Sequence, residues 1–527
     1  MAASAAPAAS RRPPRRQLQL TFAGLLMSVL LAALDQTIVS TALPSIVGDL
    51  SGLEHLSWAI TAYVLASTVG LPVYGKLGDL FGRKMVFLAA IVVFLLGSVL
   101  CGIAQDMGQL VAFRAIQGLG GGGLFIGAQA IIADLVPPRE RGRYMGLIGA
   151  AFGLASVSGP LLGGFLTDWA SWRWVFYVNV PLGLASLAFV QVFLHLPVGQ
   201  RRRPRLDYLG TLLLAGTSTA VVLLTSWAGT VHGWSSPPIL ALAAASLVLG
   251  ALFLLVERRA EEPIIPLHLF RIRNFVVPTA AAVCVGVLMF ATISYLPTFL
   301  QMVNRASATV SGLMMVPITV GMLFGTIGTG QLIARTGRYK VFPVLGSVVM
   351  AVGLLLLSRI DETTPYWWTA LGMVVMGFGI GCLMQNLVLI VQNAVPGHEV
   401  GAATSSSNYF RQIGASFGIS VFGSVFVDRL GRELAAAAPG GSPIPVGDVN
   451  ALSPQVLAAL PGPVQDAVAH AFGRALPPIF LYGLPVAAVC LVLALCIREI
   501  PLRTGAEPVP EDATGRAPER AAERVGD

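Results

Sequence analysis

Long apolar runs recur along this chain at the length that a helix needs to cross a lipid bilayer. A membrane-spanning helix takes about 20 apolar residues, and the charged fraction here is only 11%, against about a quarter in soluble proteins. We therefore predict an all-α polytopic membrane protein. The fourteen predicted spans, each uncertain by several residues at its ends, lie at about 20–47, 57–75, 85–105, 109–133, 143–166, 173–196, 207–228, 238–257, 275–301, 309–334, 341–358, 366–394, 403–428 and 477–497.

The basic residues test this assignment of spans. Lys and Arg gather on the cytoplasmic loops of membrane proteins, and with a cytoplasmic N-terminus most of the 34 Lys and Arg residues fall on the inner side. The net charge of +8 is then explained by topology, so a lipid bilayer and no nucleic acid is the expected partner. We expect both termini to lie in the cytoplasm.

The order of the spans predicts how the chain is organised. We divide it into a basic cytoplasmic N-terminus, an N-terminal six-helix half, a two-helix central insert, a C-terminal six-helix half and a disordered cytoplasmic tail. These segments are residues 1–19, 20–200, 201–270, 271–500 and 501–527. Residues 429–476, rich in Ala, Pro and Gly, form the one long outer loop. The basic N-terminus also fits a secretory signal, but further spans follow, so we expect an uncleaved first helix.

One segment between the second and third spans carries an unusual pattern of glycine and charge. It reads GKLGDLFGRK from Gly75 to Lys84, and we call it the signature loop. Gly75 and Gly82 allow close helix approach and a tight turn. Asp79, Arg83 and Lys84 place a small charge cluster at the cytoplasmic surface.

This pattern resembles the signature loop of the major facilitator superfamily. The resemblance implies that Asp79 lies near the N-terminus of the thirteenth span, around residues 402–405, where the helix dipole favours an anion and would hold the inner side closed. A weaker echo at residues 330–338 lacks the acidic residue. Asp134, at the inner end of the fourth span, is expected to form a surface ion pair near Arg139 and Arg141.

The fifth span resembles the motif of the drug/proton antiporters of that superfamily. Gly159, Pro160, Gly163 and Gly164 follow the motif, with Ala155 where the pattern usually has glycine. Small residues four apart let helices approach closely, and a proline removes one backbone donor and bends the helix. We call these four motif residues the antiporter seam, a contact expected to let the halves rock without leaking.

Three further segments are similar to the fourteen-helix drug/proton antiporter family. They lie at residues 34–44, 172–181 and 297–317, so the resemblance covers nearly the whole chain. It implies a major facilitator fold with two six-helix halves and two inserted central helices.

Ionisable residues inside the spans are the strongest functional signal, because a charge in hydrocarbon costs a few kcal/mol. Asp35, Arg114 and Arg411 stand out, and a rise of about 1.5 Å per residue places the first two at similar depth. Arg114 with Gln117 and Gly118 resembles a pattern that the family places beside its proton pathway. Our hypothesis is that Asp35 takes up a proton from outside and Arg114 tunes it. The alternative is a permanent ion pair that only orients helices.

Polar and aromatic side chains midway along the second half are candidates for contacting cargo, because amides orient a ligand in an apolar cavity without selecting one chemistry strongly. The alternative for each of them is an interhelical hydrogen bond without a role in binding cargo. For Arg411 the alternatives are that it faces the cavity or that it caps a carbonyl. With Gln117 from the first half, the candidates are Tyr295, Gln301, Gln385, Asn386, Gln392, Asn408 and Arg411. This half has no acidic residue within its spans, which favours cargo with one or no charge.

The motifs give no support for an enzyme. Residues 120–123 are glycine-rich but lack the Lys-Ser/Thr of a phosphate loop, and the five cysteines lie in apolar runs without metal or disulfide spacing. We expect no metal and no cofactor, with the proton as coupling ion, in a protein that works as a monomer in the bacterial inner membrane.

These features together predict a proton-driven exporter of amphipathic small molecules that works by alternating access. The second reading is a lipid or metabolite carrier of the same fold in which Asp35 only stabilises the structure. The third is a receptor or sensor on a transporter scaffold. A large soluble output domain would favour this reading, and the sequence shows none.

Overall fold

The computed structural model describes residues 15–50, 56–196, 207–228, 232–436 and 461–502. Within these ranges the chain is helical, with no β-strand beyond an isolated bridge between Ala228 and His232, so the predicted all-α class is confirmed. The helices are α1 (Arg15–Leu50), α2 (Leu56–Phe81), α3 (Arg83–Gly102), α4 (Met107–Leu135), α5 (Pro138–Trp169), α6 (Trp174–Tyr177), α7 (Asn179–Phe193), α8 (Tyr208–Trp227), α9 (Pro237–Glu257), α10 (Arg273–Met302), α11 (Ala308–Met314), α12 (Val316–Thr336), α13 (Val341–Leu357), α14 (Tyr366–Asn393), α15 (Val400–Ala436), α17 (Gly462–Ala475), α18 (Pro477–Tyr482) and α19 (Leu484–Cys496).

Each predicted span coincides with one helix or with two consecutive helices. Among the described residues, 12 helical segments are long and apolar enough to cross a bilayer. The apolar helix α13 is shorter, and the 32-residue α5 covers the remaining predicted span. The chain is therefore a multi-pass membrane protein, and the total of fourteen spans stays a prediction.

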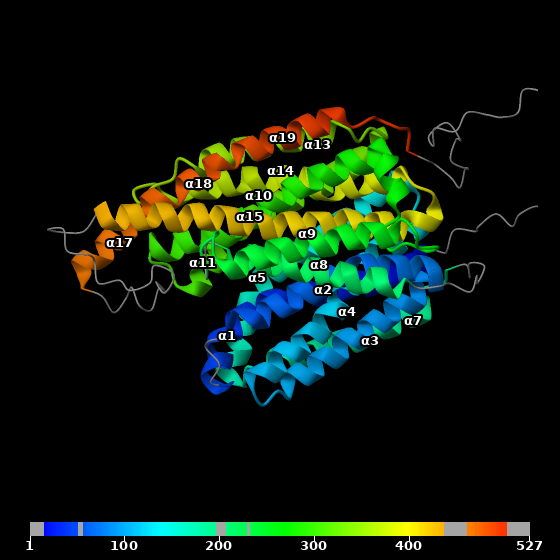
Figure 1. Ribbon diagram of the computed structural model, residues 1–527, viewed down its shortest axis with the longest axis horizontal. Coiled ribbons are helices and arrows are strands. Elements are labelled where there is room, and N and C mark those ends of the chain that lie inside the picture. The colour runs from blue at the N-terminus through cyan, green and yellow to red at the C-terminus, as the bar shows by residue number, and fades with distance from the viewer. Residues whose placement is uncertain (1–14, 51–55, 197–206, 229–231, 437–460, 503–527) are drawn as a thin grey trace, which may run out of the picture.

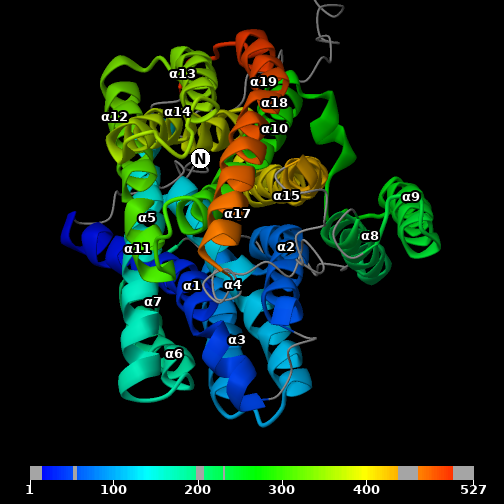
Figure 2. The same ribbon diagram turned by 90° about the vertical axis from the view of Figure 1, so that its left-hand side faces the viewer.

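The helices form two bundles that repeat one packing order (Figures 1 and 2). In the first bundle α4 packs on both α2 and α3, while α1 packs on α5 and α7. In the second, α14 packs on both α12 and α13, while α10 packs on α15 and α19. Two sequence segments with the same internal arrangement are the mark of a structural repeat, as in many membrane transporters.

Glycines at matching places allow this close packing in both bundles. A side chain at Gly118 of α4 would overlap the backbone of Tyr63 on α2, and one at Gly377 of α14 would overlap the backbone of Ile318 on α12. The glycine-rich run of α4 therefore serves helix contact, because small residues let two membrane helices approach to backbone distance.

The helices α8 and α9 lie at the flank of the two bundles, next to α2 and α15 (Figure 2). A buried hydrogen bond of 2.8 Å between Ser218 and Tyr409 joins α8 to α15, and the rings of Trp58 and Trp227 join α8 to α2. The outer helix α9 exposes large apolar side chains such as Leu247, as expected of a helix that faces lipid.

Two segments differ from their predicted form. The signature loop is almost entirely helical: α2 continues to Phe81 and α3 begins at Arg83, so only Gly82, with φ of 95°, lies between them. Positive φ suits glycine because it has no Cβ, and one such residue is enough to reverse the chain.

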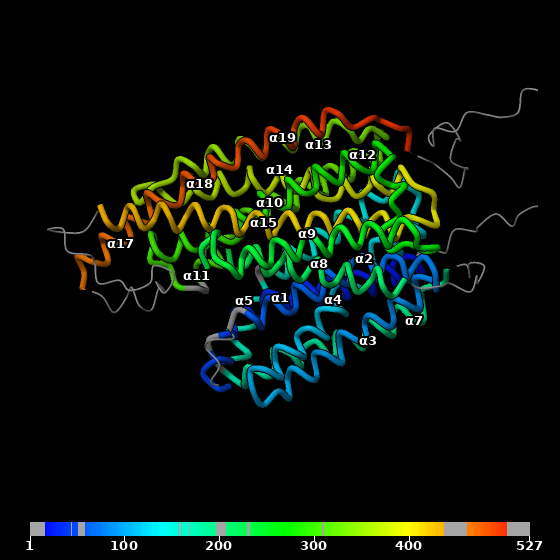
Figure 3. Tube along the Cα trace, viewed as in Figure 1, coloured from blue at the N-terminus to red at the C-terminus, as the bar shows by residue number. Residues whose placement is uncertain are grey.

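Both ends of the predicted outer loop 429–476 are helical. Figure 3 shows α15 as one continuous helix that runs the length of its bundle toward α17, and it ends only at Ala436. Residues 462–475 form α17, whose buried face includes Val468 and Phe472. That apolar face packs against the C-terminal bundle, and the loop's middle, 437–460, lies outside the described residues.

Candidate functional site

Asp35 and Arg114 form a buried ion pair between α1 and α4. Their side chains are 0% and 2% exposed, and Arg114 Nη1 lies 2.5 Å from Asp35 Oδ2. The Arg114 Nε donates to the carbonyl of Ala59 at 3.2 Å, and the guanidinium lies over the ring of Tyr63. The two intramembrane charges that we placed at similar depth are thus in direct contact.

Neutral amides complete the shell of the Asp35 carboxylate. Gln117 Nε2 and Asn179 Nδ2 donate to Asp35 Oδ1 at 2.8 and 3.0 Å, and both amides also donate to Ser98 Oγ. Gln117 Oε1 accepts from Arg114 Nη1 at 2.7 Å. A buried ion pair is tolerated when such additional hydrogen bonds satisfy its remaining donors and acceptors. We call these five side chains the Asp35 network.

The Asp35 network changes one prediction and adds residues. Gln117 was a candidate for contacting cargo, but its amide is engaged by Asp35, Arg114 and Ser98, so it belongs to the ion-pair site. Asn179 and Ser98 were not predicted as site residues, because an uncharged polar residue within a span carries no sign of its partner. Asn179 did fall within one of the segments that carry the family resemblance.

The signature loop joins the two halves. Asp79 accepts hydrogen bonds from the backbone N–H groups of Gly401 and Ala402, at 3.2 and 2.8 Å, at the N-terminus of α15. These groups have no partner within their helix, and the dipole there favours an anion. A side chain at Gly75 would overlap Ser405. The predicted position of Asp79 at this helix start is confirmed.

Arg83 connects the contacts on both sides of this junction. It bonds Asp79 at 3.1 Å in its own half and the carbonyl of Gly397 at 3.1 Å in the other. It also forms an ion pair with Asp134 at 2.7 Å. Asp134 therefore forms the expected ion pair, and its partner is Arg83. Lys84 donates to the carbonyl of Gln191, within its own half.

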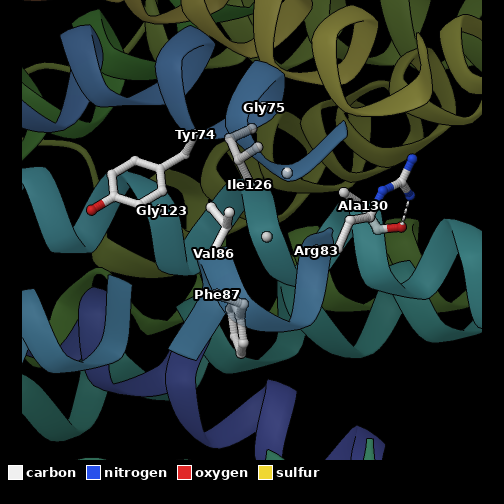
Figure 4. A pocket seen from close by; sticks show the side chains of 10 residues that line it. Tyr74, Gly75, Arg83, Val86, Phe87, Gly123, Ile126 and Ala130 are labelled. Atoms are coloured by element: carbon white, nitrogen blue, oxygen red, sulfur yellow. Dashed lines mark hydrogen bonds between the residues drawn. The ribbon is translucent and has the colours of Figure 1, made fainter. Parts of the chain in front are cut away.

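A small pocket lies beside this junction, between α2, α3 and α4. Figure 4 shows that its wall is apolar or backbone, including Tyr74, Val86 and Phe87. Its one charged side chain, Arg83, already binds the Ala130 carbonyl, Asp79 and Asp134. The one charged group in the pocket lining is therefore already engaged.

A second contact between the halves joins α5 to α12. Arg139 donates to the carbonyls of Ala334 and Arg335, both at 3.0 Å, and a side chain at Gly330 would overlap the backbone of Gly142. The echo of the signature loop has Ala334 at the position that Asp79 takes in the loop itself. Here Arg139, from the opposite half, instead binds the free carbonyls that end α12. Both contacts lie at one end of the bundle, which we call the signature-loop end.

The antiporter seam lies inside the N-terminal half. A side chain at Gly159 would overlap Thr37, and one at Gly163 would come within 2.9 Å of the Ile38 carbonyl, both on α1. Thr37 also donates to the carbonyl of Ala155 at 3.0 Å. A methyl group added at Gly164 would meet no other atom within 4 Å, and the side chain of Pro160 lies outside the described residues. Earlier in α5, Gly142 and Gly153 contact Gly330 and Thr319 of α12 in the other half.

Some cargo candidates are held by nearby groups. Tyr295 donates to the Ile419 carbonyl at 2.7 Å, Gln301 to Ser311 at 2.9 Å and Asn386 to the Cys382 carbonyl at 2.6 Å. These three side chains therefore form hydrogen bonds within the C-terminal half.

The remaining candidates gather between α4, α14 and α15. Arg411 Nη2 donates to Asn408 Oδ1 at 2.8 Å, Asn408 Nδ2 to Gln129 Oε1 across the halves at 3.1 Å, and Gln392 Nε2 to Thr404 Oγ1 at 3.2 Å. Gln385 is 4% exposed, and both its amide atoms lack a hydrogen-bond partner among the described residues. Gln129 was not predicted, since its partner lies 279 residues away.

Two repeated helix bundles with charged residues buried between apolar helices define a polytopic membrane transporter. Comparison with known proteins gives the family: residues 25–419 match the family described as Major Facilitator Superfamily. The chain belongs to the major facilitator superfamily. This superfamily consists of transporters and not of enzymes.

Relatives and solved structures agree with this membership. The chain is 44% identical over 490 residues to the MFS-type transporter Rv1877 of Mycobacterium tuberculosis (strain H37Rv), covering 93% of this chain and 70% of the relative. It is 38% identical over 426 residues to the multidrug transporter protein MdtP of Bacillus subtilis (strain 168), covering 81% and 78%. The structure of the proton:xylose symporter XylE aligns with a TM-score of 0.60 at 14% identity, covering 91% and 95%, which supports the fold alone.

Proposed function

We propose that this transporter exports amphipathic small molecules in exchange for protons, by alternating access of its two halves. The observation that carries the proposal is the Asp35 network, a carboxylate 0% exposed whose partners are one cation and two amides. A carboxylate in the membrane interior is costly and is usually functional. Relatives named as multidrug transporters support the export of drug-like cargo.

We infer that the signature-loop end faces the cytoplasm of a bacterial cell, because the basic residues gather there. Arg114 lies seven residues into α4, or about 10 Å from the opposite end at a rise of 1.5 Å per residue. The Asp35 network is thus nearer the outer surface. In Figure 1 the halves converge at the signature-loop end and diverge toward α17.

The described contacts suggest how protonation could reach the other half. Neutral Asp35 would give up its charge-assisted bond to Arg114. Its helix α1 is tied to α5 through Thr37 and Gly159. The earlier part of α5 is packed on α12 through Gly142 and Gly330. A shift of α1 would therefore be transmitted through α5 to the contact that closes the cytoplasmic side.

The second candidate is a lipid or metabolite carrier without proton coupling through Asp35. It is favoured by the completeness of the Asp35 network, since a carboxylate with three hydrogen-bond donors is also what a purely structural ion pair needs. Transport by such a carrier would not depend on the pH gradient.

Transport in proteoliposomes with an imposed pH gradient tests the proposal. We expect wild-type protein to move a fluorescent amphipathic dye with the gradient, and transport by Asp35→Asn to fall at least tenfold while the variant still elutes as folded protein, with a thermal midpoint lowered by loss of the buried pair. Asp428→Asn is the matched control, because that carboxylate is 69% exposed. A folded Asp35→Asn protein that transports at the wild-type, gradient-dependent rate would refute the role of Asp35.

A further inference from the structure

Arg411 is a buried cation whose surroundings differ from those of Arg114. It is 8% exposed, and its shown partners are the amide oxygen of Asn408 at 2.8 Å and the face of Phe125 at 5.9 Å. Among the described residues, no carboxylate forms an ion pair with it. A guanidinium has five N–H donors, so most of its capacity to bind an anion is unused.

Gln385 lies at the level of Arg411 on the neighbouring helix. Gln392 of α14 bonds Thr404 of α15, and the two helices run in opposite directions. Moving seven residues back along α14 and seven forward along α15 reaches Gln385 and Arg411, about 10 Å farther on at 1.5 Å per residue. Seven residues are nearly two turns, so both side chains return to the faces that carry Gln392 and Thr404.

The two amide atoms of Gln385 are buried without a hydrogen-bond partner in the described chain. A buried polar group left without a partner costs free energy unless a ligand or water satisfies it. Arg411, which has no carboxylate partner among the described residues, and Gln385 therefore lie at one depth with unused N–H donors. A ligand with a hydrogen-bond acceptor would satisfy both.

The opposite wall of this region comes from the N-terminal half. The Phe125 ring packs edge-on against Phe152, with centroids 5.5 Å apart, and Gln129 bonds Asn408 across the halves. The aromatic pair supplies an apolar surface beside the charged group. The hydrogen bond that Asn408 donates to Gln129 holds the halves together here, so a ligand must enter when they separate.

We propose that Arg411 and Gln385 bind the anionic group of the cargo, and that the cargo is an amphipathic organic acid whose apolar part contacts Phe125 and Phe152. This inference rests on the proposed export function and names its substrate class. Arg411 binds the charge, since a guanidinium pairs with carboxylate or sulfonate in a planar, two-bond geometry. Gln385 then donates to the same group.

Binding of three pyrene probes that differ only in charge tests the proposal. The probes are 1-pyrenebutanoate, 1-pyrenebutanol and 4-(1-pyrenyl)butyltrimethylammonium, measured by fluorescence on protein in nanodiscs without a pH gradient. We expect wild-type protein to bind the anion at least tenfold more tightly than the cation. Arg411→Gln should abolish this preference, Arg411→Lys should keep part of it, and Arg432→Gln, an exposed arginine, should leave it unchanged.

Two results would overturn the assignment: wild-type protein that prefers the cation, or Arg411→Gln protein that loses affinity for all three probes equally. Because wild-type selectivity is measured without any variant, misfolding of Arg411→Gln does not remove the test. Because no gradient is present, a failure here is separate from a failure of proton coupling at Asp35.

Discussion

Arg114 in the N-terminal half and Arg411 in the C-terminal half both lie buried within membrane spans, but their charges are met in different ways. Arg114 meets the carboxylate of Asp35, a backbone carbonyl and an aromatic ring. Arg411 meets an amide and a ring, with no carboxylate among the described residues. One site is electrically complete without a ligand and suits proton exchange. The other lacks an anion and suits a charged cargo.

The largest expected effect is a difference in the free energy of unfolding between variants of the two arginines. Arg114→Gln leaves the Asp35 carboxylate buried without its cation, which costs about 3–5 kcal/mol when a buried pair is broken. Arg411→Gln removes a buried charge and leaves no opposite charge behind, so we expect a change within about 1 kcal/mol. Unfolding monitored by tryptophan fluorescence in detergent measures both.

The double variant Asp35→Asn with Arg114→Gln is the control, because it removes both charges. It should recover most of the lost stability, since no uncompensated charge remains. If Arg411→Gln destabilised the protein as much as Arg114→Gln, the contrast between the halves would be wrong.

The second prediction concerns the glycine contact between the halves. Gly330→Ala places a methyl group against the Gly142 backbone, and overpacking of this kind costs about 1–3 kcal/mol. The cost falls on the closed state alone. The population of molecules open at the signature-loop end should therefore rise by roughly tenfold or more. Spin labels on the first turns of α5 and α13 would report longer distances.

Gly328→Ala is the matched control, in the same helix and with nothing within 4 Å of the added carbon. Its distance distribution should equal that of the labelled parent. Equal distributions for the two alanine variants would mean that the halves do not close through this contact.

The third prediction weakens the signature loop. Asp79→Asn removes the negative charge at the start of α15, where a dipole interaction is worth about 1 kcal/mol or less, so the open population should rise by up to about fivefold. The same spin-label distances measure it. Asp134→Asn also loses a bond to Arg83 but does not touch α15, and it should change the distances less.

The smallest effect is expected at the exposed end of α12. Arg139→Gln loses two hydrogen bonds to carbonyls on a solvated surface, where such contacts contribute a few tenths of a kcal/mol. The open population should change less than twofold, as read from cysteine labelling rates at the signature-loop end. A change larger than that of Asp79→Asn would reverse the ranking of the two contacts.

The sequence by itself determined the helices and the positions of the buried charges. Apolar length is a local property, so each predicted span coincides with helix, and a charge within such a run is visible without knowing its surroundings. The family pattern also placed Asp79 at the start of the thirteenth span, where α15 provides two N–H donors.

Only the tertiary structure decided which side chains meet. Gln117 joined the Asp35 network, Gly159 faced α1, Arg83 was found paired with Asp134, and Gln129 met Asn408. Each of these contacts depends on how helices distant in sequence are rotated and crossed. An amide or a glycine has many equivalent partners in one dimension, and packing in three dimensions selects among them.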